Sequence, residues 1–203
     1  MTGYPRLLQE IVDHGMLCAG RAANITHWLL QTSHLPGAVV ELGCHAGVTG
    51  VLLAMVSGKQ VWLYDSFEGL PPPTAGDLGA LKCFKVGALK VSENSVYEKF
   101  SQYGLPEPTV HKGWFNQLGP KTLPEQISFA HLDGDLYTSI LDSLERVYPR
   151  MVSGAVCVID DYGWSGTPGV YWAVHDFMRN RKEAVIKMLT GNANTFQGMF
   201  IKV

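Results

Sequence analysis

The chain has 203 residues, a formal net charge of −2 at pH 7 and 46% hydrophobic residues, which suits one domain with one sizeable core. No block of basic residues marks a nucleic-acid surface, and no apolar stretch approaches the roughly 18 residues that cross a membrane. We therefore expect no nucleic-acid and no membrane partner. The first residues show no basic segment followed by an apolar one, so we expect a cytoplasmic protein.

The first part of the chain, residues 5–32, has apolar residues at helical spacing, such as Ile25, Trp28 and Leu29. Gly15 and Gly20 interrupt this pattern, so it predicts a broken pair of helices within residues 1–35. Such leading helices serve packing or subunit contact, and we expect a homo-oligomer. They can also close over a cofactor.

The cysteines lie far apart in the sequence and show no CxxC spacing, which favours reduced structural thiols over a disulfide or a zinc site. They are Cys18, Cys44, Cys83 and Cys157. Cys44 differs from the others because it lies in a turn where its backbone would touch a ligand.

Residues 38–54 predict a buried strand, a tight turn at Gly43 and Gly47, and a helix. A side chain at either glycine would keep the backbone away from a ligand, and the following helix presents unpaired N–H groups. The spacing is Gly-x-x-x-Gly, whereas the dinucleotide fingerprint is Gly-x-Gly-x-x-Gly. This difference disfavours a nicotinamide dehydrogenase.

Two acidic residues follow the first two strands. Glu41 lies at the end of the first strand, where a carboxylate repels a pyrophosphate and holds an ammonium group. Residues 61–64 form the second strand and lead into Asp65, the place where an acidic residue meets ribose hydroxyls in nucleoside-binding α/β units. Together they indicate S-adenosylmethionine as the ligand. The alternative is a plain glycine turn, with Asp65 capping the next segment.

The stretch after Asp65 is long and irregular, because three consecutive prolines at 71–73 remove backbone donors. Residues 71–104, helical only at about 95–103, form an insertion that predicts a lid, or else a surface excursion. Residues 109–115 predict a third strand, whose end would bring Trp114 or Phe115 near an adenine. Core packing is the alternative use of these aromatic residues.

Two further predicted strands end in paired acids. Residues 127–132 lead into Asp133 and Asp135, and residues 155–159 lead into Asp160 and Asp161, with a helix predicted at 137–151. Crowded carboxylates at the ligand-binding edge of an α/β sheet repel one another, and a hard divalent cation relieves this. The alternative for each pair is a helix cap or a solvated loop acid.

The remaining chain predicts a helix at 170–181 and strands at 184–189 and 195–203, joined by a turn at 191–194. The fold class is therefore α/β: a single doubly wound, Rossmann-like seven-stranded sheet, mostly parallel with a C-terminal antiparallel hairpin.

With these residues in place, the chain resembles the macrocin O-methyltransferase (TylF-like) family of class I S-adenosylmethionine-dependent methyltransferases, which methylate sugar hydroxyls on natural products. The resemblance extends over about residues 36–163. Its motifs are Val-Val-Glu-Leu-Gly-Cys-His-Ala-Gly, Tyr-Asp-Ser-Phe-Glu-Gly-Leu-Pro, Lys-Gly-Trp-Phe, His-Leu-Asp-Gly-Asp-Leu-Tyr, Tyr-Pro-Arg and Val-Ile-Asp-Asp-Tyr-Gly.

The resemblance implies roles for individual residues. Asp133, Asp160 and Asp161 would hold Mg²⁺, and Asp135 would act as the general base beside an acceptor with vicinal hydroxyls. Replacing Asp160 by Asn is then expected to weaken metal binding. The implied residues around S-adenosylmethionine are Glu41, Gly43, Cys44, His45, Gly47, Thr49, Asp65, Ser66, Gly113, Trp114 and Asp133.

Two other interpretations stay open. Catechol-type metal-dependent O-methyltransferases share the glycine turn and the acidic strand ends, but they carry a lysine three residues after the first metal aspartate. This chain has Leu136 at that position, preceded by Asp135, and a carboxylate base beside a metal suits an aliphatic hydroxyl better. The second alternative is a non-catalytic binder of S-adenosylmethionine.

Overall fold

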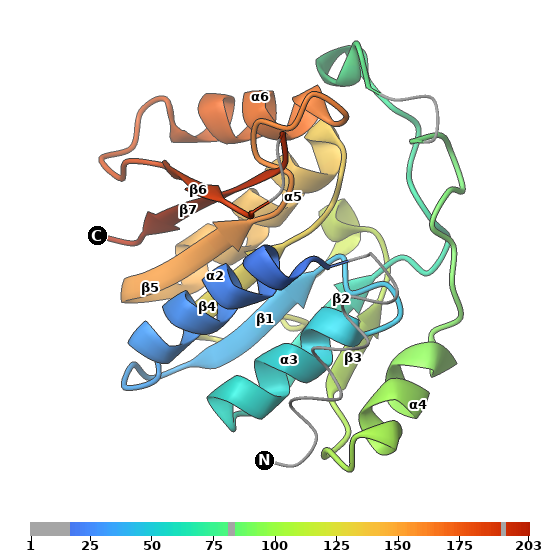
Figure 1. Ribbon diagram of the computed structural model, residues 1–203, viewed down its shortest axis with the longest axis vertical. Helices are drawn as coiled ribbons and strands as arrows, with labels where there is room; N and C mark the ends of the chain where they lie inside the picture. Colours follow the sequence, from blue (N-terminus) through green and yellow to red (C-terminus); the bar gives the residue numbers. More distant parts are fainter. Residues whose placement is uncertain (1–16, 81–83, 192–193) are drawn as a thin grey trace.

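A seven-stranded sheet with helices on both faces forms the body of the molecule in the computed structural model (Figure 1). The structure describes residues 17–80, 84–191 and 194–203. The strand order is β3-β2-β1-β4-β5-β7-β6. The strands are β1 (Ala38–Leu42), β2 (Val61–Asp65), β3 (Thr109–Lys112), β4 (Ile127–Leu132), β5 (Met151–Ile159), β6 (Ile186–Leu189) and β7 (Phe196–Ile201).

The first five strands pair in parallel, and the last two add an antiparallel hairpin. β7 pairs antiparallel with β5, and β6 pairs antiparallel with β7. This arrangement confirms the fold class expected from the sequence. The order reverses at β1, which lies between β2 and β4, so the crevice where α/β sheets bind ligands opens beyond the carboxyl ends of these strands.

Helices cover the two faces in separate groups. α2, α3 and α4 pack on one face through residues such as Ile25, Val51 and Phe100, and α5 and α6 pack on the other. The strands between them are buried on both sides, which explains their nearly continuous hydrophobic sequences. The helices are α2 (Ala19–Gln31), α3 (Val48–Ser57), α4 (Asn94–Gln102), α5 (Tyr137–Val147) and α6 (Pro168–Met178).

Helix boundaries differ from expectation in α2, α5 and α6, and α6 spans Pro168–Met178 rather than 170–181. Gly20 lies inside the first turn of α2 rather than interrupting it. The position requires a glycine, because a Cβ there would come within 1.7 Å of the Thr190 carbonyl oxygen. α5 ends at Val147 instead of 151, since Pro149 lacks the N–H that would continue the helix. The part of the first expected helical region before residue 17, with Gly15, lies outside the described residues.

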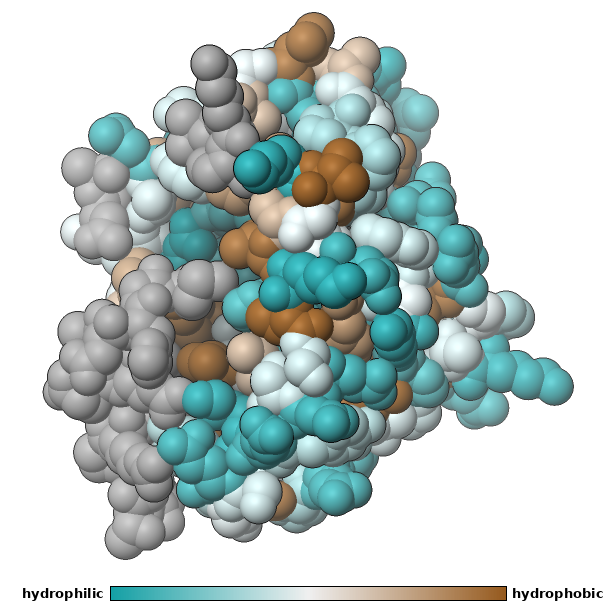
Figure 2. All heavy atoms as spheres, turned by 90° about the vertical axis from the view of Figure 1, so that its right-hand side faces the viewer, coloured by the Kyte–Doolittle hydropathy of each residue, from teal (hydrophilic) through white to brown (hydrophobic). Residues whose placement is uncertain are grey.

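The segment between β2 and α4 forms a long excursion along the right-hand edge of Figure 1. Two backbone hydrogen bonds close its base: Leu70 N–H donates to the Ala88 carbonyl at 2.8 Å, and Gly87 N–H donates to the Leu70 carbonyl at 3.0 Å. Buried Asp77 fixes its middle by accepting a 2.7 Å hydrogen bond from Tyr137 N–H at the start of α5. Figure 2 shows this side of the molecule, where hydrophobic side chains are exposed among hydrophilic ones.

The connection between α6 and β6 holds a buried carboxylate, Glu183, whose side chain is 3% exposed. It accepts hydrogen bonds from the Tyr148 hydroxyl, the Val203 N–H and the Lys202 ammonium, at 2.8, 3.3 and 3.4 Å. Burial alone raises the pKa of Glu183, but these hydrogen bonds outweigh it and lower the pKa to about 2.

Cys18, Cys44 and Cys157 are free thiols, and Cys83 lies outside the described residues. Burial raises the pKa of Cys44 and of Cys157, which keeps both thiols protonated at neutral pH. Among the described residues, no helix combines the length and the apolar character needed to span a membrane.

Candidate functional site

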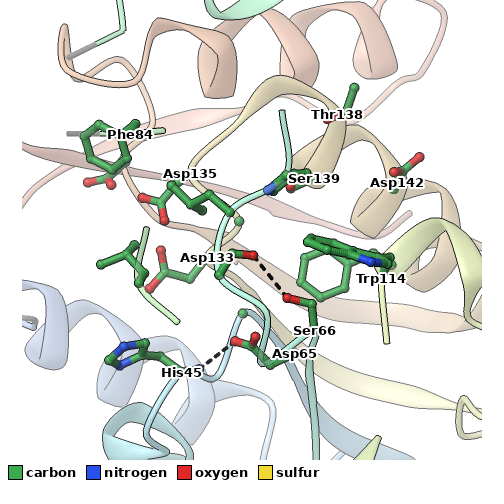
Figure 3. Close-up of a pocket in the computed structure, with 18 of the residues that line it drawn as sticks. His45, Asp65, Ser66, Phe84, Trp114, Asp133, Asp135, Thr138, Ser139 and Asp142 are labelled. Atoms are coloured by element: carbon green, nitrogen blue, oxygen red, sulfur yellow. Dashed lines mark hydrogen bonds between the residues drawn. The ribbon is translucent and has the colours of Figure 1, made fainter. Parts of the chain in front are cut away.

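A cavity of about 760 Å³ opens at the carboxyl ends of the central strands. This volume lies in the upper part of the range of about 300–1,000 Å³ typical of small-molecule sites. Its lining comes from every strand end of the crevice, from α2, from the start of α5 and from the excursion between β2 and α4. Figure 3 shows the acidic, polar and aromatic side chains that converge on it.

The first turn owes its glycines to close packing within the protein. Gly43 has φ +97°, and a Cβ there would lie 1.9 Å from the Asp133 carbonyl oxygen. Gly47 has φ +84°, and a Cβ there would lie 3.2 Å from a methyl of Val96 on α4. Gly43 also lines the cavity. The need for glycine at 43 therefore arises where β1 and β4 approach each other, before any ligand is considered.

Asp65, at the end of β2, connects the turn after β1 with the segment that follows β2. Its Oδ2 accepts a hydrogen bond from His45 N–H at 2.9 Å (Figure 3). Its Oδ1 accepts one from Phe67 N–H at 2.8 Å. Both Asp65 and His45 line the cavity. The carboxylate keeps further lone pairs, so it can also accept hydrogen bonds from a ligand hydroxyl.

Ser66 and Trp114 form the neighbouring wall. The Ser66 hydroxyl donates to the Gly69 carbonyl at 3.1 Å, which fixes the start of the excursion. Gly113 N–H donates to the Asp65 carbonyl at 2.9 Å, so the chain leaving β3 turns toward the cavity and presents Trp114 there (Figure 3). An aromatic face beside a carboxylate suits an adenosine.

Glu41 lies beneath the cavity rather than on its surface. The residue is only 1% exposed. Its carboxylate oxygen Oε1 lies 2.9 Å from Nδ1 of His131, which is fully buried on β4. Burial raises the pKa of Glu41, and the hydrogen bond with His131 opposes this. The structure thus pairs Glu41 with a histidine inside the core, and Glu41 is not among the residues that line the cavity.

The residues expected around the cofactor divide into two groups. Four of them do not line the cavity: Glu41, Cys44, Gly47 and Thr49. The others line it together: Gly43, His45, Asp65, Ser66, Gly113, Trp114 and Asp133.

Three carboxylates converge on one point of the cavity. One oxygen from each of Asp133, Asp135 and Asp161 lies within 4.8 Å of the other two. Asp135 and Asp161 have φ values of +60° and +55°, which only a few per cent of non-glycine residues adopt and which cluster at functional sites. These left-handed positions turn both side chains toward Asp133.

The electrostatics of the group follow from its crowding. Burial raises the pKa of Asp133 well above its usual range, and the charges of Asp160, Asp135 and Asp161 raise it further. Burial, together with the charges of Asp161 and Asp160, raises the pKa of Asp135. Burial, together with the charge of Asp160, raises the pKa of Asp161. The carboxylates share protons near neutral pH unless a cation compensates their charge.

Asp160, whose charge acts on all three of these acids, pairs with a residue that the sequence motifs did not indicate, Arg21 on α2. The guanidinium donates to Asp160 Oδ2 at 2.5 Å and also pairs with Asp161 Oδ1. The other oxygen of Asp160 accepts a 2.7 Å hydrogen bond from Gln197 Nε2. The available signal was positional: Arg21 lies one turn before buried Ile25, and a charge on the apolar face of a helix requires a buried partner.

The wall opposite Trp114 is largely apolar. Phe84 and Trp164 meet edge to face with ring centroids 5.8 Å apart, and both line the cavity with Leu70, Pro71, Pro72 and Leu89. Trp164 lies directly against Gly166, where a Cβ would come within 2.5 Å of the indole ring. The sequence did not single out Phe84 and Trp164, because single aromatic residues in irregular segments carry no periodic signal.

Comparison with known proteins gives consistent matches. The sequence model described as Macrocin-O-methyltransferase (TylF) matches residues 10–194. The chain is 31% identical, over 85% of its length and 72% of the relative, to an enzyme of Streptomyces olivaceus named 8-demethyl-8-(2,3-dimethoxy-alpha-L-rhamnosyl)-tetracenomycin-C 4'-O-methyltransferase. It is also 31% identical, over 82% of its length and 70% of the relative, to mycinamicin III 3''-O-methyltransferase of Micromonospora griseorubida.

Solved structures agree with the fold. The O-methyltransferase NovP superposes with a TM-score of 0.77 at 25% identity, covering 93% of this chain and 81% of NovP. The calicheamicin methyltransferase CalS11 superposes with a TM-score of 0.73 at 17% identity, covering 93% of this chain and 84% of CalS11. SMU.1697c of Streptococcus mutans, solved in complex with SAH, superposes with a TM-score of 0.63 at 14% identity, covering 89% of this chain and 97% of SMU.1697c.

Proposed function

The chain belongs to the macrocin O-methyltransferase (TylF) family, and from that premise we propose that it methylates a sugar hydroxyl of a glycosylated natural product, using S-adenosylmethionine and Mg²⁺. The observation that carries this proposal is the group of three carboxylates, Asp133, Asp135 and Asp161, in the same cavity as Asp65 and Trp114. The part of the cavity at Asp65 and Trp114 suits a nucleoside. The three carboxylates line the same cavity, so a hydroxyl held beside them would be close to the bound cofactor.

The donor set fits a hard divalent cation. Oxygen ligands are those that Mg²⁺ prefers, and burial, together with the neighbouring carboxylate charges, raises the pKa values of these carboxyl groups. Asp133 and Asp161 would hold the ion, with Asp135 beside them. Bound Mg²⁺ would supply Lewis acidity that lowers the pKa of an acceptor hydroxyl and orients a vicinal diol.

The residues of the cofactor part would bind and orient. Asp65, fixed by the backbone N–H groups of His45 and Phe67, would accept hydrogen bonds from the ribose hydroxyls. Trp114 would lie against the adenine, with Ser66 next to it. The glycine turn at Gly43 would leave room for the methionine part. S-adenosylmethionine supplies the methyl group from a positively charged sulfonium.

Asp135 would act as the general base. The acceptor oxygen gains the methyl group and loses its proton, and a carboxylate next to that oxygen can take the proton. Burial and neighbouring charges raise the pKa of Asp135 to about 8, so the carboxyl group is largely protonated at neutral pH. A bound cation would lower this pKa again and leave a carboxylate that can take the proton.

Phe84 and Trp164 would form the acceptor side. Their rings and the neighbouring prolines offer apolar contact, which suits the C–H face of a sugar ring or an attached aglycone. We propose that the excursion at 71–104 serves as a lid over this side. The relatives are named for a rhamnosyl-tetracenomycin and for mycinamicin III, and for this chain we propose a small acceptor with vicinal hydroxyls. Association into a homo-oligomer stays a prediction, which light scattering tests.

The test is a set of calorimetric titrations followed by a turnover assay. S-adenosylmethionine and S-adenosylhomocysteine are titrated into metal-stripped protein, with and without MgCl₂. Methyl transfer to a panel of rhamnosylated acceptors and catechols is then measured with and without MgCl₂.

We expect cofactor binding without metal, and turnover of a glycosylated acceptor that depends on Mg²⁺. Turnover of catechols alone would assign the chain to the catechol-type reaction. Absence of cofactor binding in both states would refute the methyltransferase proposal.

A further inference from the structure

We propose that Asp142 is a specificity-determining residue of the cofactor part of the cavity: its carboxylate accepts a hydrogen bond from the exocyclic amino group of the adenine. Asp142 lies on α5 and lines the same cavity as Asp65 and Trp114. It is the one acidic residue in the described lining to which the proposed function gives no role. The inference rests on the proposed function, because it takes S-adenosylmethionine as the ligand.

The carboxylate of Asp142 lacks a partner within the protein. Among the described residues it takes part in no hydrogen bond and no ion pair, although the residue is partly buried. Burial raises the pKa of Asp142, the charge of Glu145 raises it further, and the charge of Arg146 lowers it. An ionised carboxylate can only accept hydrogen bonds, and a partly desolvated acceptor without a donor is unfavourable. A ligand that offers an N–H group would therefore satisfy it.

The usual partner of such an acid on a helix is engaged elsewhere. Arg146 lies four residues after Asp142, a spacing at which opposite charges can pair. Its guanidinium donates instead to the carbonyl oxygens of Asn116 and Phe115, at 2.6 and 3.3 Å. These bonds hold the segment after β3 against α5, and the same segment brings Trp114 into the cavity. The contact thus places Trp114 close to this part of α5 and leaves the Asp142 carboxylate available to a ligand.

The arrangement of side chains in the cavity matches an adenosine. Asp65, at the end of β2, would take the ribose hydroxyls, and Trp114 would lie against the base. Figure 3 shows Asp142 on the Trp114 side of the cavity, away from Asp133 and Asp135. A base that lies against Trp114 with its ribose at Asp65 would direct its outer edge toward α5. In adenine this edge carries the amino group, which is a hydrogen-bond donor.

A carboxylate at this edge distinguishes adenine from a base without the amino group. A hydrogen bond to a charged group is stronger than one between neutral groups. A site that hydrogen-bonds a donor of its ligand rejects an analogue that lacks the donor, because the acceptor of the protein is then left unpaired. Asp142 would thus recognise the cofactor and take no part in methyl transfer.

The experiment uses calorimetry without metal on the full-length protein and three variants. Each is titrated with S-adenosylhomocysteine and with the analogue in which hydrogen replaces the adenine amino group. Asp142→Ala removes the acceptor, and Asp142→Asn keeps an acceptor oxygen without the charge. Glu145→Ala is the matched control, because Glu145 is an exposed acid on the same helix and lies outside the cavity. Circular dichroism verifies that each variant is folded.

The parent protein should bind S-adenosylhomocysteine at least about tenfold more tightly than the analogue. Asp142→Ala should bind the two ligands within about twofold of each other, because only S-adenosylhomocysteine loses a contact. Asp142→Asn should keep a reduced preference of about threefold, since a neutral acceptor remains. Glu145→Ala should keep the parental preference. A merely structural role of Asp142 would weaken both ligands equally and leave the preference unchanged.

Two results would overturn the inference and leave the methyltransferase proposal standing. One is a parent protein that binds both ligands equally well, which would show that the amino group is not recognised. The other is a parental preference in Asp142→Ala or, if that variant does not fold, in Asp142→Asn. Absence of S-adenosylhomocysteine binding in the parent protein would instead refute the cofactor of the proposed function, and the role of Asp142 would fail with it.

Discussion

Replacing Gly43 by alanine separates two reasons for a glycine in the first turn. If the glycine exists to admit a ligand, the substitution should affect cofactor binding and leave the unliganded protein about as stable as before. If it exists because β1 and β4 approach closely, the unliganded protein should lose stability. The structure supports the second reason, because the added Cβ would lie 1.9 Å from the Asp133 carbonyl oxygen.

The magnitude follows from two contributions. The backbone has φ +97°, and a left-handed conformation costs an alanine about 1–2 kcal/mol. A Cβ at that distance must move by more than 1 Å, and forced packing of this kind costs about 1–3 kcal/mol. The free energy of unfolding should therefore fall by about 2–5 kcal/mol. Gly58 is the matched control, with φ +62° and nothing within 4 Å of the added Cβ, so Gly58→Ala should cost only about 1–2 kcal/mol.

Urea unfolding of both variants without cofactor measures the difference. With a slope of about 2 kcal/mol/M, a difference of about 2 kcal/mol shifts the midpoint of Gly43→Ala below that of Gly58→Ala by about 1 M. Equal midpoints would refute the packing argument. A stable Gly43→Ala protein that has lost S-adenosylmethionine binding would restore the ligand-based reason.

Three further predictions concern the base, the acceptor wall and pH. Asp135→Asn should lower kcat by about 100-fold or more while S-adenosylmethionine binding stays unchanged in calorimetry; a parental rate would remove Asp135 as the base. Trp164→Ala should raise the acceptor KM by about tenfold. The control is Trp172→Ala, which should leave the KM unchanged because Trp172 is 52% exposed and lies outside the cavity; equal effects of the two substitutions would remove the role of Trp164 in acceptor contact. Glu183→Gln should lower the free energy of unfolding at pH 7 by about 1–3 kcal/mol. The lowered pKa of Glu183 stabilises the folded state fully above about pH 4.5 and progressively less as the pH falls toward 2, so the two proteins should converge near pH 2 in unfolding measured against pH.

The fold could be predicted from sequence because its signals are local and repeated. Hydrophobic runs such as residues 127–132 are buried on both faces of the sheet, and each helix follows its strand with apolar residues at regular spacing. The boundaries that differed depend on single interactions, such as the carbonyl of Thr190 beside Gly20. No local pattern reveals a contact between residues 170 positions apart.

The site was predictable to the level of residue type. Acids at strand ends converge because parallel strands end at one edge of the sheet, and Asp133, Asp135 and Asp161 do meet there. The place of Glu41 was not predictable, since its orientation depends on the buried partner His131. A carboxylate at the end of a strand can point into the crevice or into the core, and the sequence of the strand is compatible with both.

The pair Asp160 and Asp161 shows why two adjacent acids cannot be assigned one role from sequence. Successive side chains along a strand point to opposite sides, and Asp160, directly after the end of β5, still donates its N–H to the Leu132 carbonyl at 2.9 Å, as the next strand residue would. Its carboxylate therefore faces Gln197 and Arg21. Asp161 leaves the strand through a left-handed turn at φ +55°, which aims its carboxylate at Asp133 and Asp135. Asp160 and Asp161 thus point in different directions after the end of β5, although both pair with Arg21, and single substitutions can separate their roles.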